Sequence, residues 1–414
     1  MKPEPGEKEQ RRAAVLDASH ENSWSAPIQT ARVVTRDFTE LHICARPEAG
    51  PLGFEEQARS MYEVLLRELR SRGARPSDVV AEKVFLGAAA RFDRMRAIRN
   101  EFYAGGGGAG AAAPGKRPLA PATSCVGQSP AWLGQLCELQ ALAILPAGPA
   151  AVVSRGIAGL PPGAGGRVVE AGDVRHVFVS NLTGGSPGDG MDFSRQATSM
   201  FLKAEAALRL EGLSFRDVVR TWIYLADIDR DYAALNDVRR QFFASRGVLP
   251  PPASTGIGGA PDPPDRACGL DLRAIARGGS VQVSPIGAPS MCEAPAYGSD
   301  FSRGMRVDFP GHSILYVSGT ASIDTEGQVV HVGNIEDQVE RMLVNVEQVL
   351  AGQGAGFPDI VSATTYLKRP DYLETFRSVA ARRGLSGGVL NTICVADVCR
   401  PDWLCEMELT AILA

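Results

Sequence analysis

The sequence repeats one pattern three times, and this internal repetition constrains the fold more than any other feature. A glutamine followed four residues later by a methionine occurs at Gln57, Gln196 and Gln338. An acidic residue followed by two branched apolar residues begins at Asp78, Asp217 and Asp359. For both landmarks, 139 residues separate the first copy from the second and 142 separate the second from the third. This agreement indicates three copies of one structural unit.

An Ala-Ile pair closes each copy, beginning at Ala143, Ala274 and Ala411. We therefore expect repeats at residues 31–145, 168–278 and 300–414. Some of the sequence outside this common pattern is rich in glycine, alanine and proline, a composition typical of linkers and surface insertions. The remaining expected segments are a disordered tail at 1–30, a Gly/Ala-rich insertion at 104–118 within the first repeat, and linkers at 146–167 and 279–299.

The third copy shows the internal order of one unit. Short β-rich segments predict strands at Ile314–Ser318, Val361–Lys368 and Leu404–Leu413. Helical spacing of apolar residues predicts an amphipathic helix at Glu336–Leu350, and a second helix is expected at Tyr372–Arg383. The order strand, helix, strand, helix, strand predicts an α+β fold with the helices on one face of a sheet.

The balance of charge excludes several classes of protein. Lys and Arg number 43 against 47 Asp and Glu, and a formal net charge of −4 argues against a nucleic-acid binder. No segment approaches the roughly 18 apolar residues that a membrane span requires. The N-terminus has no apolar core of a secretory signal, so we expect a cytoplasmic protein. The eight cysteines form no CxxC pair and the five histidines are scattered, which predicts no metal site.

The closing strand of the third copy carries a candidate catalytic carboxyl group. Strand alternation places Glu406 and Glu408 on the same face of a segment that reads as half buried, so at least one of them needs a partner or a raised pKa. A salt-bridged structural carboxylate is the alternative interpretation. Alignment of the copies puts Glu138, Gly269 and Glu406 at equivalent positions. The three copies therefore cannot be equally active, and we expect Glu138 to be vestigial or structural.

Two groups of motifs carry a resemblance to known families. The second and third copies resemble the YjgF/Rid fold in Phe178-Val-Ser-Asn, Asp217-Val-Val-Arg-Thr-Trp-Ile-Tyr, Leu315-Tyr-Val-Ser-Gly and Cys405-Glu-Met-Glu-Leu. They also resemble the chorismatases in Thr221-Trp-Ile-Tyr-Leu-Ala-Asp-Ile, Asp231-Tyr-Ala-Ala-Leu-Asn-Asp-Val-Arg, Pro252-Ala-Ser-Thr-Gly-Ile-Gly-Gly, Ala296-Tyr-Gly-Ser-Asp-Phe-Ser-Arg-Gly and Ala396-Asp-Val-Cys-Arg-Pro. The first copy is less typical, and its Gly/Ala-rich insertion has no counterpart.

The resemblance implies both an architecture and a reaction. YjgF/Rid proteins are homotrimers with clefts between subunits, so three tandem YjgF/Rid-like repeats imply an intramolecular pseudo-trimer that is a monomer. Chorismatases remove pyruvate from chorismate without a metal or other cofactor. In that family a glutamate of the closing strand is the proton donor, and Glu406 occupies the matching position. A carboxylic acid with a raised pKa is the group that can protonate the methylene carbon of an enol ether.

The resemblance also assigns a role to Cys399, seven residues before Glu406. From the residues alone, Cys399 reads as a small buried hydrophobic side chain. A cysteine at this spacing is typical of the chorismatase branch that forms 3-hydroxybenzoate, where a thiol beside the ring could steer the opening of an arene-oxide-like intermediate. The other branch, which hydrolyses chorismate to a dihydroxycyclohexadiene carboxylate, has a smaller residue there. We therefore expect a 3-hydroxybenzoate synthase, with the hydrolase as the alternative.

Chorismate carries two carboxylates, and arginine binds a carboxylate through two parallel hydrogen bonds. The resemblance places Tyr232 and Arg239 of the second copy on the substrate, together with Tyr297 and Arg303 at the entry to the third, with Arg306 as a nearby alternative. On a helix, an arginine such as Arg239 is otherwise a solvated or salt-bridged residue. By analogy with the trimeric fold, we expect these side chains to meet in the cleft between the second and third copies.

Two other classes of function stay open. A Rid-type imine or enamine deaminase relies on an arginine just before the last strands. The corresponding segments lack that arginine and read Pro121-Ala-Thr-Ser-Cys, Pro252-Ala-Ser-Thr-Gly and Leu390-Asn-Thr-Ile-Cys. A non-catalytic small-molecule binder would be stabilised by chorismate without turning it over.

Overall fold

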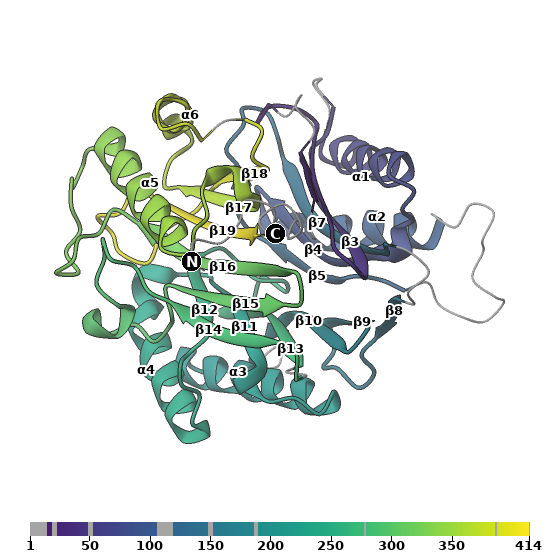
Figure 1. Ribbon diagram of the computed structural model, residues 1–414, viewed down its shortest axis with the longest axis horizontal. Coiled ribbons are helices and arrows are strands. Elements are labelled where there is room, and N and C mark those ends of the chain that lie inside the picture. The colour runs from purple at the N-terminus through teal and green to yellow at the C-terminus, as the bar shows by residue number, and fades with distance from the viewer. Residues whose placement is uncertain are drawn as a thin grey trace, which may run out of the picture.

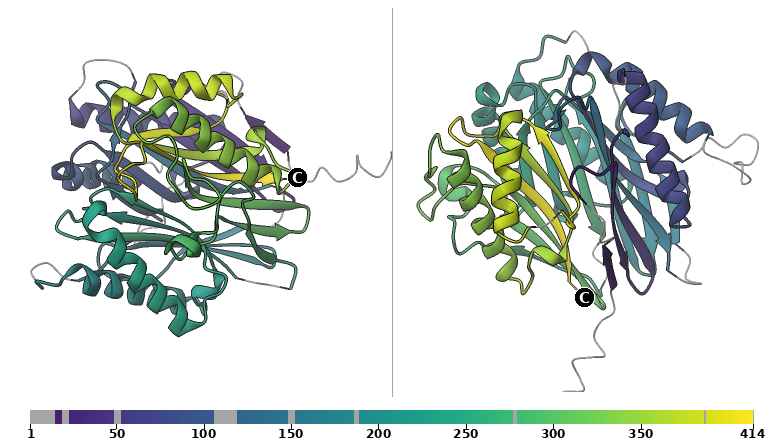
Figure 2. Two further views of the ribbon diagram at one scale, coloured as in Figure 1. Left: turned by 90° about the vertical axis from the view of Figure 1, so that its left-hand side faces the viewer. Right: turned by 90° about the horizontal axis from the view of Figure 1, so that it is seen from above.

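The computed structural model describes residues 15–18, 23–48, 53–105, 119–147, 152–185, 189–276, 279–385 and 387–413. The described residues form three sheets that meet at the centre of the molecule, with the long helices on the outside (Figures 1 and 2). The expectation of an α+β fold built from three tandem repeats is therefore confirmed. No helix within these ranges is both long and apolar enough to cross a membrane.

The three sheets share one strand order, which is the structural expression of the repeat. The first repeat comprises β1 (Val15–Ala18), β2 (Ile28–Val34), β3 (Phe38–Ala45), α1 (Phe54–Ser71), β4 (Val79–Leu86), α2 (Phe92–Gly105), β5 (Ala122–Val126) and β7 (Cys137–Pro146). The second comprises β8 (Val152–Gly156), β9 (Gly165–Ala171), β10 (Val174–Thr183), α3 (Phe193–Leu210), β11 (Val218–Leu225), α4 (Ile228–Arg246), β12 (Ala253–Gly258) and β13 (Cys268–Ala276). The third comprises β14 (Gln282–Ile286), β15 (Gly304–Phe309), β16 (His312–Ala321), α5 (Ile335–Ala351), β17 (Ile360–Leu367), α6 (Leu373–Arg382), β18 (Asn391–Val395) and β19 (Cys405–Leu413).

The core of each sheet has the same connectivity. The orders β3-β7-β4-β5, β10-β13-β11-β12 and β16-β19-β17-β18 correspond strand for strand, and the closing strand lies antiparallel between its neighbours. The short strand β6 (Ser129–Pro130) leaves the first repeat and pairs with β18 of the third. Each repeat therefore buries one apolar layer under its helices and a second layer against the other sheets.

The acidic landmark is a cap. Asp78, Asp217 and Asp359 each end a short 3₁₀ turn before the central strand and accept a hydrogen bond from the backbone N–H three residues earlier, at 2.8, 2.9 and 2.8 Å. Their carboxylates satisfy N–H groups that the turn leaves free. The repeated acidic residue therefore fixes where the central strand of each sheet begins.

The glutamine landmark holds the loop before the closing strand. Gln338 in α5 donates to the carbonyl of Asp402 and accepts from the backbone N–H of Leu404, both at 2.8 Å. Gln57 in α1 accepts from the N–H of Leu136 in the same way, at 2.9 Å. Gln196 in α3 accepts from the N–H of Ala267 at 3.0 Å. A buried amide can satisfy a loop donor and acceptor together, which explains the recurrence of glutamine.

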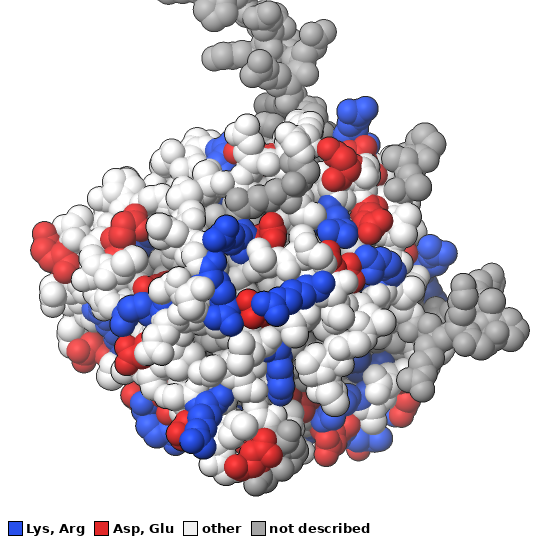
Figure 3. Space-filling model, turned by 90° about the horizontal axis from the view of Figure 1, so that it is seen from below, with Lys and Arg blue, Asp and Glu red and all other residues white. Residues whose placement is uncertain are grey.

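The segments expected as linkers contribute strands. β8 lies within the stretch 146–167 and pairs with β9, and β14 lies within 279–299 and pairs with β15. Most of the expected tail, residues 1–14 and 19–22, and residues 106–118 of the expected insertion lie outside the described residues. On the face shown in Figure 3, basic and acidic side chains are interspersed, in keeping with the nearly balanced charge of the chain.

Candidate active site

The cleft between the second and third repeats is built by β12 and the segments that lead into β15 and β19. Ala253 of β12 forms a bridge with Ser302, and Ile257 of the same strand forms a bridge with Val398. These backbone contacts place α4 of the second repeat beside the loops of the third. As a result, all six predicted site residues lie around one cleft.

Three of the six line a cavity of about 390 Å³ that opens at the surface: Tyr232, Tyr297 and Cys399. The hydroxyl of Tyr232 lies 3.3 Å from that of Ser299, across the two repeats. The guanidinium of Arg400 lies 4.7 Å from the centre of the Tyr297 ring, where cation and ring attract each other. The outer part of the cleft therefore has aromatic walls.

The two predicted arginines are buried behind this cavity. Arg239 is 1% exposed, and its Nη2 donates to Oδ1 of Asn236 at 2.5 Å, while its Nε has no hydrogen-bond partner among the residues that the structure describes. Arg303 is 2% exposed, and its Nε donates to the carbonyl of Cys292 at 3.0 Å. Both guanidinium groups lie 5.6 Å from the Phe301 ring. Among the described residues, neither arginine forms an ion pair with a carboxylate. Buried cations are normally paired, so two without an anion indicate a place for one.

Glu406 lies at the inner end of the cleft, on β19. It is 3% exposed, and burial, reinforced by repulsion from Glu408, raises its pKa to about 8, against the attraction of Arg220 and Arg303. A Cβ atom at position 319 would lie 1.9 Å from Oε1 of Glu406, so only a glycine there leaves room for the carboxyl group. At neutral pH, Glu406 is therefore a protonated acid that can donate a proton.

Glu408, two residues along the same strand, has the opposite character. Its carboxylate accepts hydrogen bonds from Arg220, from the indole of Trp222 at 2.8 Å and from the hydroxyl of Tyr366 at 3.0 Å. Lys83 of the first repeat lies 3.7 Å from it. Despite the opposing cost of burial, these groups lower the pKa of Glu408. Their surroundings thus keep Glu406 as a protonated acid and Glu408 as a carboxylate.

Cys399 stands between the outer cavity and Glu406. Burial, together with the nearby Glu406, raises the pKa of its thiol to about 12, while a hydrogen bond with Tyr232 acts in the other direction. The thiol is therefore protonated at neutral pH. It can pack against a ligand or donate a weak hydrogen bond, but it is not poised as a thiolate nucleophile.

The equivalent positions of the other two clefts are occupied differently. Glu138, the counterpart of Glu406, pairs with the buried Arg46 at 2.8 Å and accepts a hydrogen bond from Cys44 at 3.0 Å. The third counterpart is Gly269, which carries no side chain. Within the part of the chain that the structure describes, only the cleft between the second and third repeats therefore combines a protonated glutamic acid with arginines that lack a carboxylate partner.

The sequence reasoning missed several residues that shape the site. Thr255, on β12, accepts from Arg220 at 2.5 Å and from the N–H of Gly319 at 3.1 Å, which ties Glu408 to the wall beside Glu406. The position of Arg220 as the one charged residue of a central strand was an available signal. Arg306, the alternative to Arg303, instead donates to Asp308 at 2.7 Å on the outer strand β15.

Comparison with known proteins supports the architecture. The family described as endoribonuclease L-PSP matches residues 168–268 and 291–413, which together make up more than half of the chain. A crystal structure of a chorismatase superposes with a TM-score of 0.59 and 19% identity, covering 89% of this chain and 98% of the chorismatase. That likeness extends to all three repeats and shows a common fold.

Curated relatives match parts of the chain. A 3-hydroxybenzoate synthase of Streptomyces hygroscopicus is 28% identical over 227 residues, which are 48% of this chain and 64% of the synthase. The match thus spans slightly less than two thirds of that relative. Protein HMF1 of Saccharomyces cerevisiae is 27% identical over 127 residues, which are 30% of this chain and 93% of HMF1. The chain therefore belongs to the endoribonuclease L-PSP family and has the overall fold of a chorismatase.

Proposed function

We propose that the protein is a chorismatase that converts chorismate to 3-hydroxybenzoate and pyruvate in the cleft between its second and third repeats. One observation carries the proposal: two buried arginines that have no carboxylate partner among the described residues lie in the same cleft as a protonated glutamic acid. Chorismate supplies two carboxylates for Arg239 and Arg303. It also supplies an enol ether that needs an acid, which is the role of Glu406.

The first chemical step is protonation of the enolpyruvyl methylene carbon by Glu406. Addition of a proton turns the enol ether into an oxocarbenium ion, whose bond to the ring carbon is then weak. That carbon–oxygen bond breaks and the side chain leaves as pyruvate. General acids placed in this way typically accelerate a reaction by about 10²–10⁴-fold. Arg239 and Arg303 hold the substrate so that the methylene carbon faces the acid.

The second step decides the product. In the 3-hydroxybenzoate route, the neighbouring ring hydroxyl bonds to the carbon that pyruvate leaves, and its proton returns to the Glu406 carboxylate. The resulting ring oxide opens at its other carbon, the ring loses a proton as it becomes aromatic, and the oxygen gains one. Chorismate therefore gives 3-hydroxybenzoate and pyruvate with no other reactant. In the alternative, water attacks instead and yields the dihydroxycyclohexadiene acid.

Cys399 supports the aromatic route. Its side chain lies between the outer cavity and Glu406, and its thiol is held protonated by burial. A small, soft side chain there would limit the water that can reach the ring beside Glu406. Tyr232 and Tyr297 form the aromatic walls against which the ring would pack. The similarity to a 3-hydroxybenzoate synthase favours the same branch.

The test is incubation of the purified protein with chorismate, with pyruvate and the ring product measured together by mass spectrometry. Pyruvate with 3-hydroxybenzoate is the expected result. Pyruvate with the dihydroxycyclohexadiene acid would retain Glu406 as the acid and reject the role of Cys399. Intact chorismate that raises the melting temperature would instead indicate a non-catalytic binder.

Two further properties belong to the proposal. The reaction as written needs no metal or cofactor, so turnover in the presence of a chelator should equal turnover in its absence. The pseudo-trimer should act as a monomer. The turnover rate per chain should therefore not change with protein concentration. A Rid-type deaminase would instead release a carbonyl product from an imine, and semicarbazide competition with an amino-acid oxidase product would reveal it.

A further inference from the structure

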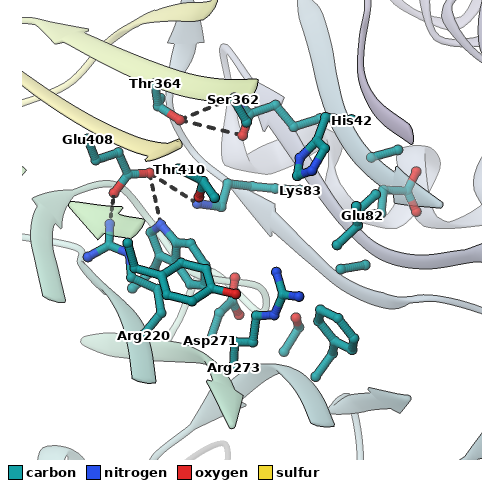
Figure 4. Close-up of a pocket in the computed structure, with 18 of the residues that line it drawn as sticks. His42, Glu82, Lys83, Arg220, Asp271, Arg273, Ser362, Thr364, Glu408 and Thr410 are labelled. Carbon is teal, nitrogen blue, oxygen red and sulfur yellow. Dashed lines mark hydrogen bonds and ion pairs between the residues drawn. The ribbon is translucent and has the colours of Figure 1, made fainter. Parts of the chain in front are cut away.

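A second cavity, of about 130 Å³, lies where the three sheets meet (Figure 4). Equivalent positions of the three repeats form its wall, because the same strand pairs face the centre in each sheet. One set comprises Lys83, Trp222 and Thr364, a second comprises Gln140, Asp271 and Glu408, and a third comprises His42, Phe178 and Tyr316. The cavity is therefore on the pseudo-threefold axis and is distinct from the cleft described above.

The three repeats contribute different chemistry to this axial cavity. The first supplies the ammonium group of Lys83, and the second supplies the indole of Trp222 and the guanidinium of Arg273. The ring centres of Phe178 and Tyr316 lie 4.9 and 5.2 Å from the guanidinium carbon of Arg273. In a symmetric homotrimer, each of these sets of equivalent positions would carry the same side chain three times. Divergence of the copies has instead produced a mixed lining of basic, acidic and aromatic side chains.

The carboxylates of the cavity already have partners. Glu408 is saturated by the contacts given above. Asp271 accepts from Ser124, from the backbone N–H of Asn181 at 2.8 Å and from the hydroxyl of Tyr224 at 3.0 Å. Figure 4 shows the carboxylate of Glu82 directed away from the cavity, where Arg99 donates to it at 3.0 Å.

The cations of the cavity are less well satisfied. Lys83 is buried. Its ammonium lies 3.7 Å from the carboxylate of Glu408, which is beyond a normal hydrogen bond, and 4.6 and 5.5 Å from the ring centres of Trp222 and Tyr224. Nε of Arg273 has no hydrogen-bond partner among the described residues, whereas its Nη2 donates to Oε1 of Glu40 at 3.4 Å and lies 3.3 Å from Nδ1 of His176. Among the described residues, the ammonium of Lys83 forms an ion pair with Glu408 but has no acceptor within hydrogen-bond distance, which is costly for a buried group with three donors unless an acceptor enters.

We propose that the axial cavity is a binding site for a small organic carboxylate whose apolar part is no larger than a benzene ring. Lys83 and Arg273 would hold the carboxylate, and the rings of Trp222, Phe178 and Tyr316 would pack against the apolar part. The volume is slightly smaller than the roughly 150 Å³ of an engineered apolar cavity that binds benzene, and the axial cavity is partly open, which leaves room for a carboxylate outside the ring. The aromatic lining favours an organic anion over a bare inorganic one.

Fluorobenzoate, observed by ¹⁹F NMR, is a suitable probe because its carboxylate and ring match the two halves of the site. Titration of the purified full chain should give a saturable bound resonance. Ala81→Leu should abolish it by filling the cavity, since Ala81 lines the wall, and Lys83→Met should weaken binding about tenfold or more. Ala244→Leu, the same enlargement on the exposed face of α4, should leave binding unchanged.

Two further arms separate the axial cavity from the cleft. Arg303→Met should retain the bound resonance, because Arg303 belongs to the cleft. A resonance lost in Arg303→Met and kept in Ala81→Leu would overturn the proposal, as would the absence of any bound resonance in the wild-type protein. Equal displacement of the probe by chloride and by benzoate would also reject an organic carboxylate. None of these readouts depends on turnover of chorismate.

Discussion

Replacement of Glu406 by glutamine tests the acid through two independent properties. Glutamine has nearly the same shape and fits beside Gly319, but it cannot ionise or donate an acidic proton. If Glu406 protonates the substrate, Glu406→Gln should lower the rate of pyruvate release by about 10²–10⁴-fold. Wild-type activity should also fall as the pH rises through about 8, where Glu406 loses its proton.

The stability of the same variant has a predicted sign and size. The pKa of Glu406 is about 8 in the folded protein against an ordinary value of 4.5. Below pH 4.5 the carboxyl group is protonated in both the folded and the unfolded protein, so it adds no pH dependence to the free energy of unfolding. As the pH rises from 4.5 to about 8, the unfolded chain releases the proton while the folded chain keeps it, so the wild-type free energy of unfolding falls. At about 1.4 kcal/mol per pH unit, the loss reaches at most about 5 kcal/mol.

The assay is urea denaturation of both proteins below pH 4.5 and above pH 8. Glu406→Gln does not titrate, so its stability relative to the wild type should increase with pH. Glu374→Gln, on an exposed helix, should change neither turnover nor the pH dependence of stability. A stability difference that stays constant across this range would mean that Glu406 ionises normally. Undiminished turnover would remove Glu406 from its catalytic role.

Three further substitutions test the surroundings of the acid. Cys399→Ala should shift the product from 3-hydroxybenzoate toward the dihydroxycyclohexadiene acid in the mass-spectrometric assay, and an unchanged ratio would leave the thiol as packing. Gly319→Ala should displace the Glu406 carboxyl group and reduce pyruvate release about tenfold or more, since a Cβ atom would meet Oε1 at 1.9 Å; full activity would show that the carboxyl group has another productive position. Glu138→Gln should lower the free energy of unfolding by about 3–5 kcal/mol, because Arg46 would remain buried without its partner. Turnover by the folded fraction of that variant should persist, and its loss would mean that the cleft at Glu138 is also active.

The sequence allowed the fold to be predicted because its landmarks act locally. The acidic residues at 78, 217 and 359 cap turns formed by their own neighbours, and the apolar spacing of α5 defines a buried face within one helix. The limits of the strands and helices predicted in the third repeat agree with the structure to within three residues. The edge strands β8 and β14 escaped prediction because their pairing partners, and not their composition, hold them in a sheet.

Candidate residues for the site could also be chosen from the sequence, in part through the resemblance to the chorismatases. Strand alternation put Glu406 and Glu408 on one face, and the repeat alignment showed that one copy has Gly269 in place of the equivalent glutamate. The protonation states of Glu406 and Glu408 could not be predicted in the same way. Each depends on charges supplied by distant parts of the chain, and no spacing along the sequence reports those distances.

The sequence by itself therefore determined the repeated unit, the order of its two helices and three central strands, and the face on which the two glutamates lie. Only the tertiary structure decided which glutamate is the acid. Lys83 from the first repeat and Arg220 from the second neutralise Glu408, while Glu406, one pleat away, is buried without a paired cation. Electrostatic energy depends on distance in space and on the local exclusion of water, and both arise only when the three repeats pack together.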